Sequence, residues 1–486
     1  MLKDPMHPSD APSENTTSAT IPNHGSLAII GAGITGLSSA YYLLQQRPDV
    51  KITIFEAADQ AGGILQTEQH DGFLVELGPD MFTTREPEAI DLCHELEIED
   101  QLISTNTEHR GAYILSQNRL CKIPLGWTMM TPTRLGSILT TRLLSWKGKL
   151  RVIGELFIRC QRTEEDESLA SFTRRRLGQE AFERIIQPLI SGIYTADPEK
   201  LSMQATLKPF FDMERKGKGL IRGGYKQRRQ PSGDPTSSGA RYGMFVAPEQ
   251  GMQSLVQAII AALPADCLRL GCRVNEISSR TEGWSVNLEG EQQPHLFDAV
   301  LMSTSSQATS PLLTNEFPEL SKLVGRIPLA GAVVVALGYR RGDINHPLDA
   351  FGVIVPQIEN RPLIAISISS QKFAGRAPED CVLFRVFAGG ACQKEVMQWD
   401  DQQIIESTKR QLHELLQVQG EPLFSQLKRW DASMPQYHVG HVGLVDQIEQ
   451  QVAAIPGLEL AGNAYRGIGI PLCIRSAKAA IQRLIA

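Results

Sequence analysis

The chain has 486 residues, of which 42% are hydrophobic and 21% are charged, and its formal net charge is −6. This length predicts two or three domains with cores of their own, and the composition excludes disordered and collagen-like classes. The mild acidity argues against nucleic acid as a partner, because binding to the phosphate backbone needs a basic surface.

Residues 1–26 are rich in Ser, Thr, Pro and Asn and lack the apolar core of a secretion signal, so we expect a disordered leader there. No apolar run reaches the roughly eighteen residues that a membrane span needs. We therefore expect a cytoplasmic protein, either free or lying peripherally on the inner face of the cell membrane. The 8 cysteines include no Cys-x-x-Cys pair, and no histidine pattern typical of a metal site occurs, so we predict no metal.

A glycine-rich turn near the N-terminus predicts a dinucleotide site. A strand pattern at 27–30 runs into the sequence GAGITG at 31–36 and then into a helix, which is the order of a Rossmann unit. A second strand over 51–55 ends at Glu56, where an acid would accept hydrogen bonds from ribose hydroxyls. The predicted contacts are Gly31, Ala32, Gly33, Ile34, Thr35, Gly36, Glu56 and Ala57.

The next two glycine clusters favour FAD over NAD. The paired glycines Gly62 and Gly63 follow the ribose acid closely and resemble the second motif of the amine-oxidase-like flavoprotein superfamily. Gly78, Pro79 and Asp80 would bring unhindered backbone beside a flat ligand, which we take to be the isoalloxazine ring. Ordinary surface turns are the competing interpretation of both clusters.

Residues 86–241 have a mostly helical pattern, with helices expected near 134–139 and 147–159. The second of these mixes apolar and basic residues, so it could lie on an anionic membrane surface. The alternative is a helix packed on the core with solvated lysines and arginines. A basic, glycine- and serine-rich loop is predicted at 216–240.

The cofactor domain is expected to resume after this loop and again at the C-terminus. A helix over 253–262, strands at 272–277 and 284–286, and a buried strand over 297–303 are typical of its second part. A strand at 458–460, Gly462 and a glycine-rich turn lead into a helix over 472–485, whose N-terminus could face the cofactor. We therefore predict an α/β fold with a discontinuous Rossmann-type FAD-binding domain (27–85, 242–315 and 431–486), a helical subdomain (86–241) that could face a membrane, and an inserted α+β substrate domain (316–430).

With these motifs in place, the chain resembles the protoporphyrinogen/coproporphyrinogen oxidase family over nearly all of its length after residue 26. The most specific segment is PLISGIYTADPEKLSM at 188–203, and GIGIPLCI at 467–474 is similar to the bacterial branch. The resemblance implies oxidation of a porphyrinogen to a porphyrin. Six electrons would leave in three flavin cycles, with hydride passing to flavin N5 and dioxygen giving hydrogen peroxide.

The resemblance also implies roles for individual residues. Gly192, Ile354 and Phe387 would line the substrate pocket, and Arg85 would pair with a propionate. Val274 would meet the adenine, and Trp430 would lie against the flavin. From the strand–turn–helix pattern of the residues themselves, Gly462, Ile468, Gly469 and Ile470 would be the C-terminal contacts, facing either the flavin ring or its ribityl and phosphate portion.

Two alternatives stay open at this point. A flavin amine oxidase would share the cofactor motifs, although the segment around Tyr465 offers only one aromatic residue where a cage would be expected. A non-catalytic FAD-binding scaffold is the other. The sequence leaves open the oligomeric state, handover of product to the next haem-pathway enzyme, and the choice between coproporphyrinogen III, which we favour, and protoporphyrinogen IX.

Overall fold

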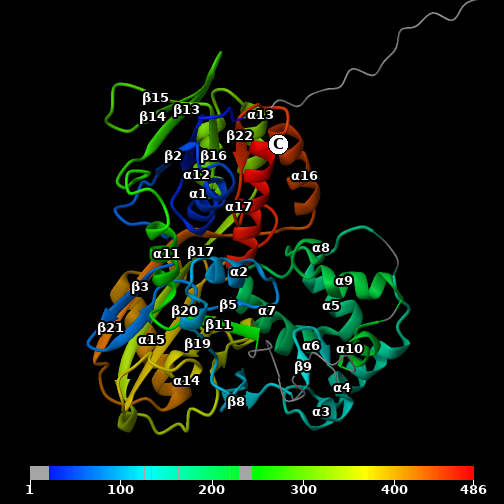
Figure 1. Ribbon diagram of the computed structural model, residues 1–486. Coiled ribbons are helices and arrows are strands. Elements are labelled where there is room, and N and C mark those ends of the chain that lie inside the picture. The colour runs from blue at the N-terminus through cyan, green and yellow to red at the C-terminus, as the bar shows by residue number, and fades with distance from the viewer. Residues whose placement is uncertain (1–20, 125, 133, 162–163, 218, 229–243) are drawn as a thin grey trace, which may run out of the picture.

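The computed structural model describes residues 21–124, 126–132, 134–161, 164–217, 219–228 and 244–486, so most of the expected leader and of the expected basic loop lies outside the described residues. Three bodies are visible in Figure 1: a domain built on a parallel sheet at the top, a large mixed sheet at the lower left and a group of helices at the lower right. Among the described residues, no helix is both long and apolar enough to cross a membrane.

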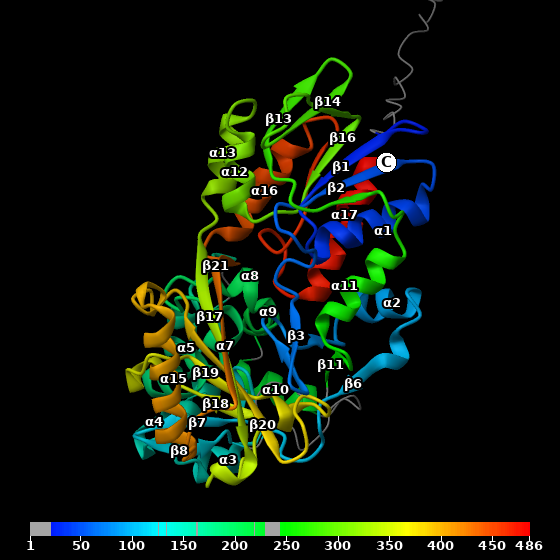
Figure 2. The ribbon, with the colours of Figure 1, turned by 90° about the vertical axis from the view of Figure 1, so that its left-hand side faces the viewer.

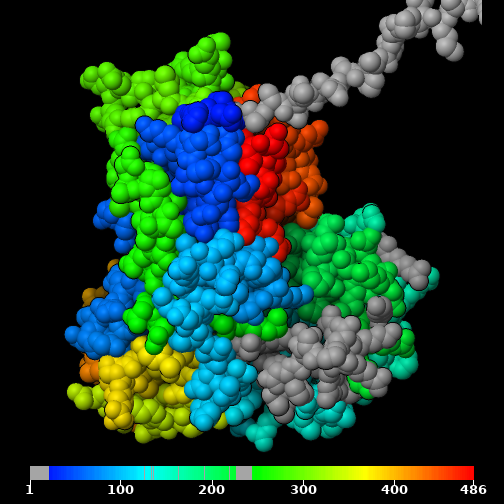
Figure 3. All heavy atoms as spheres, in the orientation of Figure 1, coloured from blue at the N-terminus to red at the C-terminus, as the bar shows by residue number. Residues whose placement is uncertain are grey.

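The upper domain is built on five parallel strands drawn from distant parts of the chain. Their spatial order is β12 (Leu268–Arg269), β2 (Lys51–Phe55), β1 (Ser26–Ile30), β16 (Ala299–Met302) and β22 (Leu458–Leu460). All four pairings are parallel, as in a doubly wound sheet. Figure 3 shows the N-terminal and C-terminal segments, in blue and red, side by side on one face. The predicted discontinuous Rossmann-type domain is thereby confirmed.

Apolar side chains point alternately to the two faces of this sheet. Figure 2 shows the helices and strands that pack on each face. One face is covered by α1 (Ile34–Gln46), α11 (Met252–Ala261) and α17 (Ile470–Ile485). The other is covered by the strands β13 (Val274–Arg280), β14 (Gly283–Leu288) and β15 (His295–Phe297), and by the helices α12 (Ser306–Leu313), α13 (Pro318–Gly325) and α16 (His441–Val452).

The single strand expected over 297–303 is two strands. β15 and β16 are separated at Asp298, whose carboxylate accepts hydrogen bonds from the Ser26 N–H at 2.6 Å and from the Ser26 hydroxyl at 2.8 Å. These bonds tie the break to the first residue of β1. The prediction missed the break because the partner lies 272 residues away.

The lower sheet has seven strands. Their order is β21 (Phe424–Pro435), β17 (Leu329–Arg340), β20 (Cys381–Gly389), β19 (Ala365–Ile368), β18 (Gly352–Ile354), β7 (Tyr113–Ser116) and β8 (Arg119–Lys122). Only β18 and β7 pair in parallel. One face packs on α15 (Asp401–Leu416) through an apolar core. β7 and β8 come from the segment expected to be mostly helical, and that expectation is wrong over residues 102–132, where the structure has strands. The domain boundaries themselves remain predictions.

Helices do form the later part of that segment. They are α3 (Leu135–Thr140), α4 (Trp146–Ile153), α5 (Leu169–Leu177), α6 (Gln179–Ala181), α7 (Gln187–Tyr194), α8 (Met203–Thr206), α9 (Lys208–Arg215) and α10 (Leu220–Arg228). The helix expected over 147–159 ends at Ile153 and continues only as a 3₁₀ turn over Gly154–Phe157. Shorter elements join the bodies: β3 (Thr67–His70), β4 (Phe73–Glu76), β5 (Phe82–Thr83), α2 (Glu88–Glu95), β6 (Leu102–Ser104), β9 (Trp127–Thr128), β10 (Thr131–Pro132), β11 (Phe245–Pro248) and α14 (Ser369–Lys372).

A buried carboxyl group anchors the start of α11. Glu76 is 2% exposed and accepts hydrogen bonds from the Met252 N–H and the Thr67 hydroxyl, both at 2.8 Å. Burial raises the pKa of Glu76 to about 7, against the lowering effect of these hydrogen bonds and of nearby arginines.

This raised pKa predicts a pH-dependent stability difference between the wild type and Glu76→Gln. The unfolded carboxyl ionises near the ordinary glutamate pKa of 4.5, whereas the folded one stays protonated up to about pH 7. Protonated Glu76 therefore contributes fully below about pH 4.5, and its contribution is lost as the pH rises through about 7. Urea unfolding should show Glu76→Gln gaining about 3 kcal/mol relative to the wild type between these limits. A difference that is flat with pH would contradict the shift.

Candidate functional site

The glycine turn after β1 is built by close backbone packing. Gly31 has a φ of 101°, which favours glycine. A Cβ on Gly36 would lie 2.0 Å from the Gly31 carbonyl oxygen and 2.6 Å from Ser303 Oγ, so no other residue fits there. The Ser303 hydroxyl in turn donates to the Gly31 carbonyl at 2.9 Å. The predicted tight turn and close helix approach are both present.

Two helices begin at glycines that face open space. Gly33 precedes α1 and Gly469 precedes α17, and neither helix has a side chain that caps its first N–H groups. A Cβ on either glycine would meet nothing within 4 Å. Free N–H groups at the positive end of a helix dipole are typical partners of phosphate and other anions. Ile34, Thr35 and Ile470 are buried in the first turns, and Ile468 is half-buried beside Gly469.

Glu56 lies at the carboxyl end of β2, beside the glycine turn. Its carboxylate accepts hydrogen bonds from the Ala32 N–H at 2.7 Å and the Ala58 N–H at 2.9 Å, with Ala57 exposed between them. The Cys272 N–H donates to the Glu56 carbonyl at 2.8 Å. This bond brings the start of β13, where Val274 lies, next to the predicted ribose acid.

A path of close backbone contacts leads away from Gly33. Gly62 forms a bridge with Gly33, and a Cβ on Gly63 would lie 3.4 Å from the Gly33 Cα. A Cβ on Gly78 would lie 1.8 Å from the carbonyl oxygen of Ile64. The three glycine clusters that the sequence predicts, 31–36, 62–63 and 78–80, are therefore contiguous in space.

The C-terminal glycine turn is held by two residues that the sequence reasoning did not single out. The Tyr437 hydroxyl donates to the Asn463 carbonyl at 2.6 Å and accepts from the Gly467 N–H at 2.9 Å. The Tyr437 ring stacks on His441, with the ring centroids 3.8 Å apart. Gly462, with a φ of 127°, precedes this turn. The sequence pattern, with a tyrosine four residues before the histidine that begins α16, gave no sign of these distant partners.

Strand register brings two predicted pocket residues into one row. Ile354 pairs with Ala365, and Ala365 pairs with Phe387, so the side chains of all three lie on the same face of the lower sheet. We call this the site face; it also carries Val334 and Arg385. It lies opposite the face that packs on α15.

The same sheet also contacts the predicted flavin segment. The Trp430 indole N–H donates to the Leu77 carbonyl at 2.6 Å. Trp430 is thereby fixed directly beside Gly78 and Pro79. Its contact with the flavin remains a prediction.

Gly192 lies in the last turn of α7, next to the site face. A Cβ on Gly192 would meet nothing within 4 Å, and Ile354 packs against the apolar core to which α7 belongs. The loop after α7 is tied to the end of β20, because the Ala391 N–H donates to the Thr195 carbonyl at 2.9 Å. Gly192, Ile354 and Phe387 therefore belong to elements that the structure brings together.

Arg85 is exposed, and its backbone N–H donates to Thr83 Oγ1 at 3.1 Å. It is not a cap of α2, whose N-cap is Pro87. Three residues further on, Glu88 pairs with Arg475 of α17 at 2.5 Å, so this segment lies beside the C-terminal helix. In the part of the chain that the structure describes, Arg85 has no hydrogen bond or ion pair with Gly192, Ile354 or Phe387, so its place in the pocket remains a prediction.

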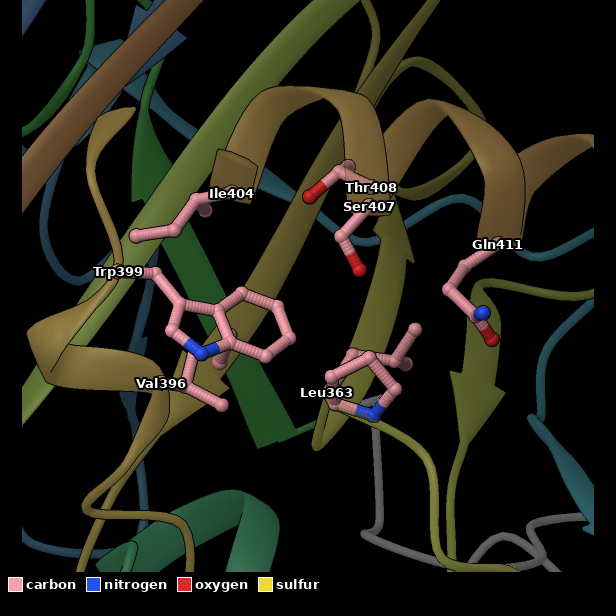
Figure 4. Close-up of a pocket in the computed structure, with 9 residues that line it drawn as sticks. Leu363, Val396, Trp399, Ile404, Ser407, Thr408 and Gln411 are labelled. Atoms are coloured by element: carbon pink, nitrogen blue, oxygen red, sulfur yellow. The ribbon is translucent and has the colours of Figure 1, made fainter. Parts of the chain in front are cut away.

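A pocket between α15 and the lower sheet is shown in Figure 4. Its walls include Trp399, Ile404 and Gln411, and they leave no room for a water molecule. It lies under the face opposite Ile354 and Phe387. We therefore assign it to core packing between helix and sheet.

The residues present fit an FAD molecule. The dinucleotide part would be held by the two uncapped helix starts, by the space in front of Gly33 and by the ribose acid Glu56. The backbone at 78–80 would lie beside the ring.

In Glu56→Ala, FAD should bind about ten- to hundredfold more weakly, because charge-assisted hydrogen bonds contribute roughly 1.5–3 kcal/mol. Fluorescence titration of the apoprotein with FAD measures this, and an unchanged dissociation constant would remove Glu56 from the site.

Comparison with known proteins supports FAD as the cofactor. Residues 34–485 match the flavin-containing amine oxidoreductase family. The chain is 32% identical to coproporphyrinogen III oxidase of Bacillus subtilis, over 94% of this chain and 97% of the relative, and 27% identical to mitochondrial protoporphyrinogen oxidase of Nicotiana tabacum, over 93% and 92%. A crystal structure of a putative protoporphyrinogen oxidase from Exiguobacterium matches with a TM-score of 0.83 and 29% identity, over 94% of this chain and 98% of that one. The chain is thus an FAD-binding oxidoreductase, and it belongs to the flavin-containing amine oxidoreductase family.

Proposed function

We propose that the protein oxidises a porphyrinogen to a porphyrin in haem biosynthesis, with coproporphyrinogen III as the favoured substrate and dioxygen as the electron acceptor. The observation that carries this proposal is the continuity of the site. A glycine-lined path runs from the dinucleotide cradle at Gly33 to Gly78, and the sheet that touches Gly78 carries Ile354 and Phe387 on the same face. An apolar wall beside a flavin segment suits a flat, reduced macrocycle.

The protein's own residues need to do little chemistry. Bound FAD supplies the two-electron oxidation in each cycle. Ile354 and Phe387 would hold the macrocycle flat against the site face, and Gly192 would leave space for it where a side chain would intrude. Orientation and exclusion of water are then the main contributions of the pocket.

Substrate choice follows from the similarity to coproporphyrinogen III oxidases and is tested in air. Purified enzyme is supplied with coproporphyrinogen III or protoporphyrinogen IX, and porphyrin fluorescence and hydrogen peroxide are measured together. We expect faster oxidation of coproporphyrinogen III, with about three peroxide molecules per porphyrin, as removal of six electrons requires. Faster oxidation of protoporphyrinogen IX would overturn the substrate choice, and porphyrin formed without peroxide would overturn the choice of acceptor.

Arg85→Ala tests the propionate contact. If the guanidinium pairs with a propionate in the bound substrate, its loss removes a charge-assisted hydrogen bond of roughly 1.5–3 kcal/mol, and kcat/KM should fall about ten- to hundredfold. Reduction of the flavin by dithionite should stay normal. Wild-type kinetics with both porphyrinogens would show that Arg85 is only a solvated surface residue.

We also propose that the cytoplasmic protein rests on the inner face of the membrane through α4. Three large apolar side chains of α4 and of the 3₁₀ turn after it point outward, because Trp146, Leu150 and Phe157 are 68%, 66% and 86% exposed, while Val152 on the other side of α4 is buried. Two of its cations turn inward: Lys149 donates to the Leu139 carbonyl at 2.8 Å, and Arg151 donates to the Arg175 carbonyl at 2.7 Å. In a solvated helix these apolar side chains would face the core and these cations would face water. The observed arrangement suits a lipid surface instead.

We expect the membrane surface to be anionic, because two cations close in sequence to these exposed apolar residues, Arg142 and Lys147, are exposed as well. Leu150→Glu should weaken binding to phosphatidylglycerol vesicles at least about tenfold, since burial of a leucine contributes roughly 1.5–3 kcal/mol. Leu296→Glu is the matched control, because Leu296 is 69% exposed but lies in β15 of the upper domain. Equal loss in both variants, or no binding by the wild type, would contradict the proposal.

A further inference from the structure

Two buried cations and a partly buried carboxylate meet beside the predicted flavin segment, and their side chains have no role in the proposed function. Lys372 Nζ lies 2.8 Å and Arg385 Nη1 lies 3.0 Å from the same carboxylate oxygen of Asp80. The Lys372 and Arg385 side chains are 8% and 1% exposed, and that of Asp80 is 13% exposed. Arg385 also donates a hydrogen bond to the carbonyl oxygen of Gly78.

The cluster lies between the two halves of the candidate site. Asp80 directly follows Gly78 and Pro79, where we expect the flavin ring. Arg385 is on the site face two residues before Phe387, and its guanidinium carbon is 5.1 Å from the centroid of the Phe387 ring. Arg385 therefore touches the predicted ring segment and the predicted substrate contact at once.

The charges in this cluster do not cancel. Burial alone would raise the pKa of Asp80, but Lys372 and Arg385 hold it at about 2, so the carboxylate is ionised and faces two cations. The next buried ionisable groups nearby are Glu76 and Arg376, which add one acid and one base. Among these five described side chains, one positive charge is left over when Glu76 is ionised, and two when it is protonated.

We propose that Lys372 and Arg385 make the bound flavin easier to reduce by placing this excess positive charge beside its ring. Uptake of a hydride adds two electrons and one proton, and therefore one negative charge. A fixed cation in a poorly solvated site stabilises such a charge far more than water-exposed lysines do. The inference rests on the proposed function in one respect: FAD must be bound with its ring beside Gly78 and Pro79.

Three variants separate the charge from the ion pair. Lys372→Met lowers the net charge of the Asp80, Lys372 and Arg385 cluster from +1 to 0, Asp80→Asn raises it to +2, and the double variant restores +1 without the ion pair. The readout is the reduction potential of the bound flavin, measured with reference dyes and no substrate. We expect the potential to fall in Lys372→Met, to rise in Asp80→Asn and to return close to the wild-type value in the double variant.

The change in reduction potential also appears as a change in the affinity for reduced FAD relative to oxidised FAD. In Lys372→Met, reduced FAD should bind about tenfold or more weakly relative to oxidised FAD than it does in the wild type. Lys409→Met is the matched control, since Lys409 lies on α15, across the sheet from the site, and pairs with Glu406 and Glu421. Its potential should equal that of the wild type.

A wild-type reduction potential in Lys372→Met would overturn the proposal. A double variant whose potential shifts as far as that of Lys372→Met would also overturn it, because the ion pair and not the charge would then set the potential. The double variant also guards against poor folding, since replacing both partners of a buried pair costs less than removing one. These results stay separate from the proposed function. A protein that shows the charge-dependent potentials but oxidises no porphyrinogen would refute the function alone.

Discussion

Gly33→Val should fold as stably as the wild type and yet fail to hold FAD. The backbone at Gly33 is extended, with φ −72° and ψ 178°, which suits a β-branched residue, and a Cβ there meets no protein atom within 4 Å. Among the described residues none approaches this Cβ position, so the valine side chain would occupy the space expected for a ligand in front of α1. Because the overlap is with a pyrophosphate held against backbone, we expect a loss of about 4 kcal/mol or more, or at least about a thousandfold in affinity.

The measurement is the FAD content of the purified protein together with the thermal stability of the apoprotein. Gly443→Val is the matched control, because Gly443 lies in α16 and also faces open space. It should retain FAD. Normal FAD binding by Gly33→Val would mean that the pyrophosphate does not lie in front of Gly33. An apoprotein that unfolds at a lower temperature than the wild type would mean that the fold itself requires the open space at this position.

Arg176→Met should destabilise the helical subdomain by about 3–5 kcal/mol. Arg176 and Glu155 are both fully buried and paired, and Glu155 also accepts the Leu220 N–H at 2.7 Å at the start of α10. Removal of the arginine leaves a buried carboxylate without its cation, and such a loss is strongly destabilising. Urea unfolding of the apoprotein measures the difference.

Two comparisons give this prediction its specificity. Arg176→Met combined with Glu155→Gln should recover most of the stability, because no lone charge is then buried. Lys322→Met removes an exposed pair with Glu319 and should change stability by less than about 1 kcal/mol. A double variant no more stable than the single one would mean that packing, and not charge, decides the effect.

The parts of the fold that the sequence predicted well are local. The glycine turn at 31–36, the acid at Glu56 and the C-terminal helix depend on neighbours within one βαβ unit or one helix, and their spacing carries the physical reason. The helix expected from residue 472 begins at Ile470, a shift of two residues at its glycine start.

What could not be predicted depends on partners distant in sequence. Asp80 and Lys372 are 292 residues apart, and nothing near either one indicates the other. β7 and β8 join a sheet whose remaining strands begin at Leu329. The direction in which α4 faces was open for the same reason. Its composition allows either orientation, and the inward bonds of Lys149 and Arg151 to carbonyls of α3 and α5 decide it.

The central claim is that a porphyrinogen gives its electrons to the bound FAD, and the most direct measurement is made without oxygen. The FAD-loaded enzyme is mixed anaerobically with coproporphyrinogen III or with protoporphyrinogen IX, and the absorption of the oxidised flavin is followed. We predict that the flavin band bleaches as porphyrin appears, and faster with coproporphyrinogen III. A flavin that stays oxidised with both porphyrinogens, although dithionite reduces it at once, would contradict the claim.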